Sequence, residues 1–271
     1  MTSELGLGTY AFFWEGAQTL PDGPNPEPLP LTGMLRRTAE LGLSLFQICD
    51  YAPLLGFSAA EVSDVRSVAD DLGIHLELGT KGVAPAHLAS FLDLAGVLGA
   101  DYVRSMLYAP DSRPTLPEAE RMLRDALPAY EAAGVRLGLE TYEQVPSRDL
   151  VALVETIGSP SLGICLDPAN TVAALENPRD VVDRCAPHVN GIHVKDFAFS
   201  RRDGWVGFTL AGARMGEGLL DYAHLTDTVD PAGRGITRIV EHWLPWQGDL
   251  ETTVALERDW TRHNVEYLKE H

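Results

Sequence analysis

Cysteine is scarce in this sequence of 271 residues. Its three cysteines, Cys49, Cys165 and Cys185, form no Cys-x-x-Cys pair. An odd number of widely spaced cysteines argues against a disulfide framework and against a structural zinc cluster. We therefore expect a protein of a reducing compartment, the cytoplasm.

Positive charge is also in short supply, because 21 lysines and arginines stand against 39 aspartates and glutamates. The formal net charge is −18, and an acidic surface repels the phosphate backbone of nucleic acids. We therefore expect no nucleic-acid partner and attribute the acidity to solubility.

Long apolar runs are missing as well. The longest ones have the length of a strand, so we expect no membrane-spanning helix. The N-terminal stretch MTSELGLGTY has no basic start followed by a long apolar region, and we expect no signal peptide. Low-complexity sequence is confined to PDGPNPEPLP, residues 21–30, which predicts a proline-rich loop.

What the chain does contain is a regular alternation of short apolar segments and longer helical patterns. Glycines such as Gly73 and Gly134 stand directly before several apolar segments, as is typical where a helix ends and a strand begins. We predict eight strands, at residues 5–10, 43–49, 74–79, 101–107, 135–140, 161–167, 189–195 and 236–241.

Eight βα units in a chain of this length predict an α/β protein that folds as one (β/α)₈ TIM barrel over residues 1–271. The competing fold is an open doubly wound sheet, which usually has a glycine-rich phosphate turn after its first strand. Here the first strand is followed by the aromatic segment AFFWEG, so we favour the barrel.

The last four predicted strands end in acidic or imidazole side chains: Glu140, Asp167, His193 and Glu241. Catalytic residues of a TIM barrel lie at the C-terminal ends of its strands. Three clustered carboxylates would repel one another unless a cation lies between them. Oxygen-rich ligation with one histidine suits Mn²⁺, Mg²⁺ or Co²⁺ better than structural zinc. We therefore predict one divalent metal ion held by these four residues, with Mn²⁺ favoured.

Lys195 lies two residues after His193 in VNGIHVKDF, so both side chains point to the same face of the strand. Close to a metal, Lys195 would bind a substrate carboxylate or stabilise an enolate oxygen. An ion pair with an acid of a neighbouring strand, such as Asp167, is an equally good interpretation. For Arg104 and Glu77 we predict a structural ion pair in the core.

Residues 198–218 form a segment too long for a simple turn, and we predict a lid-like loop over the barrel mouth. Its arginines, Arg201, Arg202 and Arg214, suit an anionic or strongly polar substrate group. A solvated surface loop is the alternative.

Two further side chains are candidates for the walls of a substrate pocket. Trp14 lies in the aromatic and proline-rich segment 11–30, and an aromatic ring suits the C–H faces of a sugar. His242 follows Glu241 directly, and either it or Trp243 would face the pocket.

Five short segments resemble, in their order along the chain, the xylose-isomerase-like TIM-barrel superfamily (AP-endonuclease-2-like) of sugar isomerases and epimerases. They are LGLE, CLDPAN, GIHVKD, GEGLLD and IVE. The resemblance covers essentially the whole chain and implies a metal-dependent enzyme, often a homodimer or homotetramer. In the ketose 3-epimerases of this superfamily the two metal-binding glutamates also move protons, which implies acid/base roles for Glu140 and Glu241.

Two departures from that pattern affect the expected reaction. The epimerases usually have a histidine three residues after the aspartate, and here that position is Asn170, whose amide would bind a substrate hydroxyl. The segment HVKDF also lacks the D-x-D arrangement that holds a second metal in xylose isomerase proper.

We expect an isomerase or epimerase that converts a small sugar or keto-sugar through an enediolate. The alternative is a lyase, namely a decarboxylase, dehydratase or β-eliminating enzyme, acting on an oxidised sugar or a 3-oxo sugar acid. The segment LPWQGDLETT is similar to superfamily members that act on oxidised sugar acids. A non-catalytic sugar-binding protein is a more distant alternative.

Overall fold

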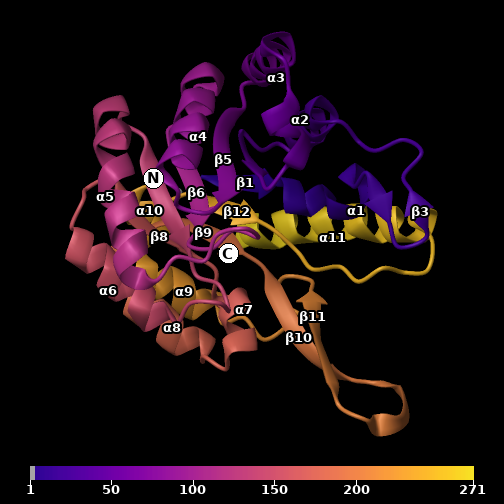
Figure 1. The fold of residues 1–271 in the computed structure, drawn as a ribbon. Helices are drawn as coiled ribbons and strands as arrows, with labels where there is room; N and C mark the ends of the chain where they lie inside the picture. Colours follow the sequence, from indigo (N-terminus) through magenta and orange to yellow (C-terminus); the bar gives the residue numbers. More distant parts are fainter. Residues whose placement is uncertain (1–3) are drawn as a thin grey trace.

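Eight parallel strands close into a barrel in the computed structural model, which describes residues 4–271 (Figure 1). The barrel strands are β1 (Leu5–Gly8), β4 (Leu45–Cys49), β5 (His75–Lys81), β6 (Tyr102–Met106), β7 (Arg136–Glu140), β8 (Leu162–Leu166), β9 (Val189–Val194) and β12 (Arg238–Val240). Their order around the barrel is β1-β12-β9-β8-β7-β6-β5-β4. The predicted (β/α)₈ fold is therefore confirmed, with every expected strand present.

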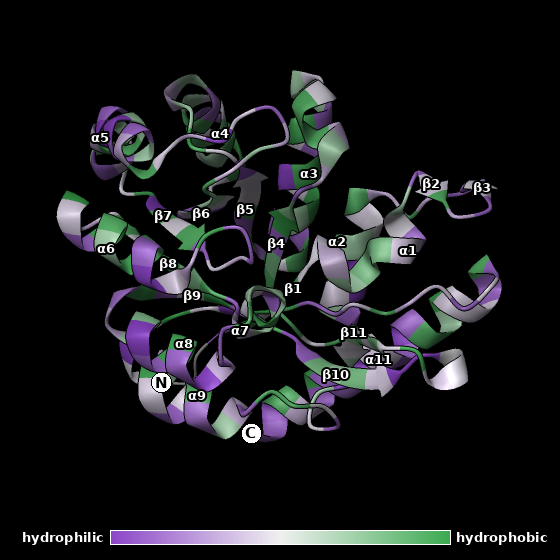
Figure 2. Cartoon of the chain, turned by 60° about the horizontal axis from the view of Figure 1, so that its bottom comes forward, coloured by the Kyte–Doolittle hydropathy of each residue, from purple (hydrophilic) through white to green (hydrophobic). Residues whose placement is uncertain are grey.

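Helices surround the barrel and cover its outer face (Figure 1). The outer helices are α2 (Leu31–Glu40), α3 (Ala59–Leu72), α4 (Pro85–Leu98), α5 (Leu116–Ala133), α6 (Ser147–Ile157), α8 (Pro178–Cys185), α9 (Tyr222–Val229), α10 (Pro231–Arg234) and α11 (Leu250–Glu270). Figure 2 shows hydrophilic residues along outer helices such as α5 and α8, while the strands inside are largely hydrophobic. Because both faces of the strands are covered, a strand such as β4 is buried along its whole length.

Short elements occupy the connections between the barrel strands and the outer helices. They are η1 (Thr9–Phe12), α1 (Phe13–Gly16), β2 (Thr19–Leu20), β3 (Gly23–Pro24), η2 (Ala52–Gly56), α7 (Pro168–Thr171), η3 (Val172–Ala174), η4 (Ala186–His188) and η5 (Asp203–Trp205). The predicted aromatic and proline-rich loop thus contains a helical turn and a small hairpin. None of the helices within residues 4–271 is long and apolar enough to cross a membrane.

The barrel is closed below the predicted ligands by Tyr102, which is fully buried. A Cβ atom at Gly138 would lie 2.0 Å from the Tyr102 hydroxyl, and one at Gly191 would lie 2.3 Å from it. Gly138 and Gly191 each stand two residues before a predicted ligand, Glu140 and His193, so they form the inward-facing layer beneath. Glycine at both positions makes room for the tyrosine ring, which places the ligands at the mouth of a filled barrel.

The segment predicted as a lid-like loop forms a β-hairpin from β10 (Asp196–Arg201) and β11 (Phe208–Ala213). Its base is tied to the loop that follows it, because the Asp196 carboxylate accepts hydrogen bonds from the backbone N–H groups of Gly216, Gly218 and Leu220. Figure 1 shows the outer end extending past α7 and away from the barrel. That this segment covers the mouth of its own barrel stays a prediction.

Candidate functional site

The four predicted ligands come together at the C-terminal end of the barrel. Glu140 ends β7, Asp167 follows β8, His193 lies in β9 and Glu241 follows β12, and these four strands are neighbours. One potential ligand atom from each residue lies within 4.8 Å of the others, and all four residues are buried. The group could therefore hold a metal ion.

The chemistry of this group fits a cation. Glu140 Oε2, Asp167 Oδ2 and Glu241 Oε1 are buried, and among the described residues none of them accepts a well-oriented hydrogen bond. Their neighbours are charged instead: Lys195 Nζ lies 2.8 Å from Asp167 Oδ2 and 2.8 Å from Glu241 Oε2, and Arg104 pairs with Glu140. Lys195 and Arg104 carry two positive charges against three carboxylates, and Arg104 is shared with Asp50, so the group still has negative charge that favours a further cation.

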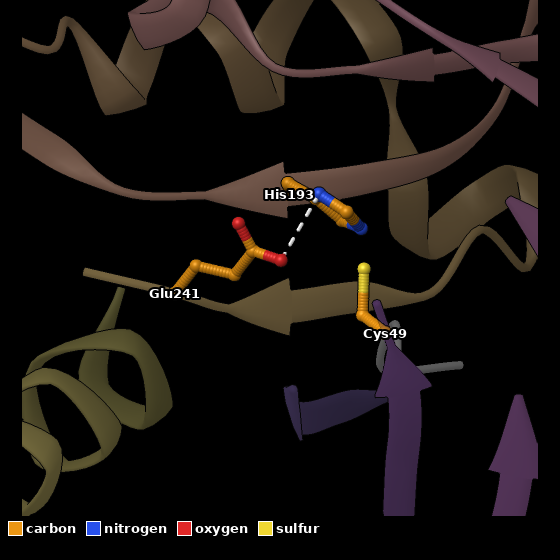
Figure 3. A group of neighbouring side chains, drawn as sticks. All are labelled: Cys49, His193 and Glu241. Atoms are coloured by element: carbon orange, nitrogen blue, oxygen red, sulfur yellow. Dashed lines mark ion pairs between the residues drawn. The ribbon is translucent and has the colours of Figure 1, made fainter. Parts of the chain in front are cut away.

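The imidazole of His193 is oriented by contacts on both sides of its ring. Nδ1 lies 3.1 Å from Glu140 Oε1 and 3.3 Å from Glu241 Oε1, and Figure 3 shows the second of these pairs. Nε2 lies 2.8 Å from Gln47 Oε1 on β4. If Nε2 carries the proton and donates it to Gln47, Nδ1 keeps a lone pair that points at the two glutamates, as a metal ligand requires.

Gln47 is itself held by a buried network that the sequence analysis missed. Its Nε2 donates to Glu77 Oε2 at 3.0 Å, and Glu77 Oε1 accepts from the Thr237 hydroxyl at 2.8 Å. Replacing Gln47 by leucine removes the acceptor for His193, and partners of metal-binding histidines typically contribute about 10- to 100-fold in affinity. We expect Gln47→Leu to weaken metal binding by about that factor in isothermal titration. Gln247→Leu, at an exposed glutamine, is the control, and equal affinity in both variants would contradict the role of Gln47.

Cys49, at the end of β4, is a second neighbour of the site that the sequence analysis did not identify. Cys49, His193 and Glu241 form an alternative group with metal-binding atoms within 4.8 Å of one another (Figure 3). Thiolate is the form of cysteine that binds metals. Burial raises the pKa of the Cys49 thiol well above its ordinary value, which keeps the thiol protonated. The group of three carboxylates and one imidazole is therefore the better candidate.

Arg104 links this group to a second acidic residue, Asp50. Its guanidinium donates to Asp50 Oδ1 at 3.1 Å and contacts the Glu140 carboxylate. Asp50 adopts a left-handed backbone conformation (φ 51°) and is also held by Tyr10 and Lys81. Burial alone would raise the pKa of Glu140, but Arg104 next to it lowers that pKa well below its usual range.

The predicted ion pair between Arg104 and Glu77 is wrong. The register of the barrel sets Glu77 directly beside Gln47 on β4, whereas Arg104 is level with Gly79. Arg104 therefore lies one inward-facing layer closer to the mouth, and its partners are Asp50 and Glu140.

Lys195 is almost completely buried, and its ammonium group forms the ion pair with Asp167 that the sequence left open. Nζ also lies 4.7 Å from the centre of the Trp243 ring and 3.5 Å from Asn170 Oδ1. Burial would lower the pKa of Lys195, but Asp167 and then Glu241 outweigh this and raise it, so the side chain is cationic. A substrate-binding role for Lys195 stays a prediction.

Asn170 connects Lys195 with the ligand group. Its Nδ2 donates to Glu140 Oε1 at 2.9 Å, and its backbone N–H donates to Asp167 Oδ1 at 3.3 Å. The amide thereby fixes the orientation of Glu140, a contact that the sequence analysis did not predict.

Two of the predicted substrate-binding residues, Trp14 and His242, line a cavity of about 490 Å³ together with Trp243. The Trp14 indole is fixed by a hydrogen bond from Nε1 to the backbone oxygen of Leu244 at 2.7 Å. His242 lies 3.1 Å from the Thr261 hydroxyl, and burial lowers its pKa to about 4, so the ring is neutral. Because Trp243 also contacts Lys195, this cavity adjoins the candidate metal site.

The arginines of segment 198–218 are not brought to the candidate ligands within a single chain. Arg201 stacks over Trp205 and Phe208 of its own hairpin, Arg202 is exposed, and Arg214 pairs with Asp259 of α11. Their predicted contact with substrate therefore stays untested.

Comparison with known proteins agrees with this architecture. Residues 2–271 match the family described as xylose isomerase-like TIM barrel. A 3-oxo-isoapionate decarboxylase of Pectobacterium atrosepticum is 51% identical over 264 residues, which cover 97% of this chain and 94% of the relative.

Solved structures share the fold at much lower identity. D-psicose 3-epimerase of Clostridium cellulolyticum, solved with D-tagatose, has a TM-score of 0.72 at 14% identity, and the match covers 98% of this chain and 97% of the epimerase. A xylose isomerase-like TIM-barrel protein of Mycobacterium smegmatis, solved with magnesium, has a TM-score of 0.70 at 17% identity, with coverage of 98% and 97%.

Proposed function

Because this chain belongs to the xylose isomerase-like TIM-barrel family, we propose that it is a metal-dependent lyase that decarboxylates a 3-oxo sugar acid. The observation that carries the proposal is the 51% identity, over nearly the whole chain, to a 3-oxo-isoapionate decarboxylase. This relative favours the lyase alternative of the sequence analysis over the isomerase or epimerase that we had placed first. The first substrate to test is 3-oxo-isoapionate, and we propose a cytoplasmic location.

One divalent metal ion, with Mn²⁺ as the first candidate, would be held by Glu140, Asp167, His193 and Glu241. The convergence of three buried carboxylates, each with one oxygen that accepts no well-oriented hydrogen bond, supports this assignment. When bound, such an ion would supply positive charge beside a carbonyl or hydroxyl oxygen of the substrate.

Decarboxylation of a 3-oxo acid is accelerated by positive charge next to the 3-oxo oxygen. The bond between the carboxylate carbon and its neighbour breaks, CO₂ leaves, and the electron pair moves onto the 3-oxo oxygen as an enolate. A proton is then added to the carbon that lost CO₂. A group that stabilises the enolate oxygen and a group that delivers this proton would therefore both accelerate the reaction.

Lys195 is suited to both tasks. Its ammonium group is buried and fixed by Asp167 and Glu241, so little reorganisation is needed when negative charge develops nearby. The flat face of Trp243 beside Nζ excludes water from one side. We propose that Lys195 pairs with the enolate oxygen and donates the proton, and that it regains a proton from solvent after the product leaves.

The contacts of Asn170 and Glu140 support this chemistry over proton shuttling by glutamates. An amide cannot serve as an acid or base, and Asn170 stands where the epimerases usually have a histidine. Glu140 is restrained by Asn170, His193 and Arg104, which suits a metal ligand better than a mobile base. Trp14 and His242 line the adjoining cavity of about 490 Å³, a size that suits a small sugar acid.

A substrate panel tests this proposal. The protein, supplied with Mn²⁺, is incubated with 3-oxo sugar acids and with ketoses that lack a carboxylate, and the products are identified by mass spectrometry. We expect products that are lighter by one CO₂ from the 3-oxo acids and no reaction of the ketoses. Isomers of the ketoses, without CO₂ loss from any acid, would show an isomerase instead.

A further inference from the structure

Exposed apolar side chains gather at one end of this molecule. Ten large hydrophobic residues are exposed in the described chain, and nine of them lie between the C-terminal end of a barrel strand and the first turn of the next helix. These nine are Phe13, Leu55, Leu116, Leu175, Phe199, Trp205, Val206, Phe208 and Leu219. The exception is Val97, near the opposite end of α4. Clustering of this kind marks an interaction surface at the barrel mouth.

The hairpin of β10 and β11 supplies four of the nine residues. Trp205 and Val206 at its tip are 77% and 79% exposed, and the Arg201 guanidinium stacks 4.9 Å from the Trp205 ring and 4.4 Å from the Phe208 ring. An isolated two-stranded hairpin is at best marginally stable in water. Tryptophan and arginine are also the residues most enriched where binding energy concentrates. The outer half of the hairpin, residues 199–208, is therefore suited to burial against a partner surface.

The remaining exposed apolar residues lie in loops or first helical turns at the same end of the barrel as the hairpin. Leu55 and Lys81 line a cavity of about 520 Å³ next to the exposed carboxylate of Asp111. Arg201 and Arg202 bring two positive charges to the tip of a hairpin that belongs to a chain of net charge −18. A second copy of the same chain is acidic overall and offers this partly apolar cavity with Asp111 in its wall, so it suits a hairpin tip that carries two arginines.

We propose that the outer half of the hairpin docks on the barrel mouth of a second copy of this chain and closes the active site of that copy. The base of the hairpin is fixed in its outward direction, because Asp196 accepts from Gly218 N–H and Gly212 N–H donates to the Trp243 oxygen (3.0 Å) in the loops that follow β11 and β12. In a dimer with two-fold symmetry, each copy places its hairpin on the barrel mouth of the other. The closing of the site rests on the proposed function, whereas the dimer does not.

Light scattering tests the dimer. We expect the wild type to have twice the mass of the 29.5 kDa chain and Trp205→Ser/Phe208→Ser to be monomeric with an unchanged far-UV spectrum. Val97→Ser, which removes the exposed apolar residue at the other end, should stay dimeric. A monomeric wild type, or a dimer that the double variant leaves intact, would overturn the interface, whatever substrate the enzyme uses.

Mixing two inactive variants tests whether the hairpin of one copy serves the site of the other. Trp205→Ala should lower kcat/KM at least tenfold, and Asp167→Asn has a defective site but an intact hairpin. In an equimolar random mixture about half of the dimers contain one copy of each variant, and one of the two sites in such a dimer has both an intact ligand group and an intact hairpin from its partner. About one quarter of wild-type activity should therefore return. If the two variants exchange subunits but activity does not return, the hairpin does not close the site of the other copy. If the wild type is a dimer but has no decarboxylase activity, only the proposed function is refuted.

Discussion

Replacing Lys195 by methionine should lower kcat for decarboxylation about 1,000-fold, which corresponds to about 4 kcal/mol of transition-state stabilisation. Methionine keeps most of the side-chain volume but removes the charge that lies 2.8 Å from Asp167 and Glu241. Metal affinity should hold or increase, because the ligands lose a competing cation. The measurement is single-turnover kinetics with saturating Mn²⁺.

The matched control is Lys269→Met on α11, where Nζ donates to the backbone oxygens of Leu41 and Gly42, far from the candidate site. It should leave kcat unchanged. If Lys195→Met kept kcat within about tenfold and raised only KM, Lys195 would bind substrate without assisting the chemical step.

Replacing Asp167 by asparagine should remove most of the bound metal and lower kcat/KM by a factor of about 1,000, because one of three anionic ligands is lost. A ligand present at 100 times its dissociation constant stabilises the folded state by about 2.7 kcal/mol. Mn²⁺ should therefore raise the melting temperature of the wild type and leave that of Asp167→Asn unchanged. Elemental analysis and thermal melts, with and without a chelator, measure both effects.

Asp221→Asn provides a control of the same chemical type. Asp167 and Asp221 both accept a hydrogen bond from the backbone three residues on, at the start of α7 and α9. Asp221, however, is only half-buried and lies outside the ligand group. Asp221→Asn should keep its metal and activity. Wild-type protein that binds no divalent metal and melts alike with and without a chelator would contradict the metal site.

The fold was predictable because each βα unit has a local signal. Helices α4 and α5 end at Gly99 and Gly134, which adopt left-handed conformations at the helix C-termini, and an apolar strand follows each. That the four predicted ligands would come together was predictable for a related reason, since the C-terminal ends of the barrel strands lie at one face. The family resemblance gave the order of the motifs but placed the isomerase ahead of the lyase.

The remaining contacts depend on features that no local pattern contains. Strand stagger in a closed barrel decides which layer a side chain enters, so Glu77 meets Gln47 while Arg104 reaches Glu140. Reading the ends of the first strands as closely as the last would have indicated Gln47 and Asp50, which are polar residues on or after the strand 43–49. The hairpin could not be distinguished from a loop in the sequence. Its outer aromatic and polar residues are all exposed, so they do not show the alternation of buried and exposed positions that marks a strand.

The most direct test of the account follows the carboxylate carbon. 3-Oxo-isoapionate labelled with ¹³C in its carboxylate is incubated with the Mn²⁺-loaded protein, and released ¹³CO₂ is compared with substrate consumed, after subtraction of spontaneous loss. We expect one ¹³CO₂ for each substrate consumed, at a rate that falls about 1,000-fold in Lys195→Met. Consumption of substrate with the label retained in the product would contradict it.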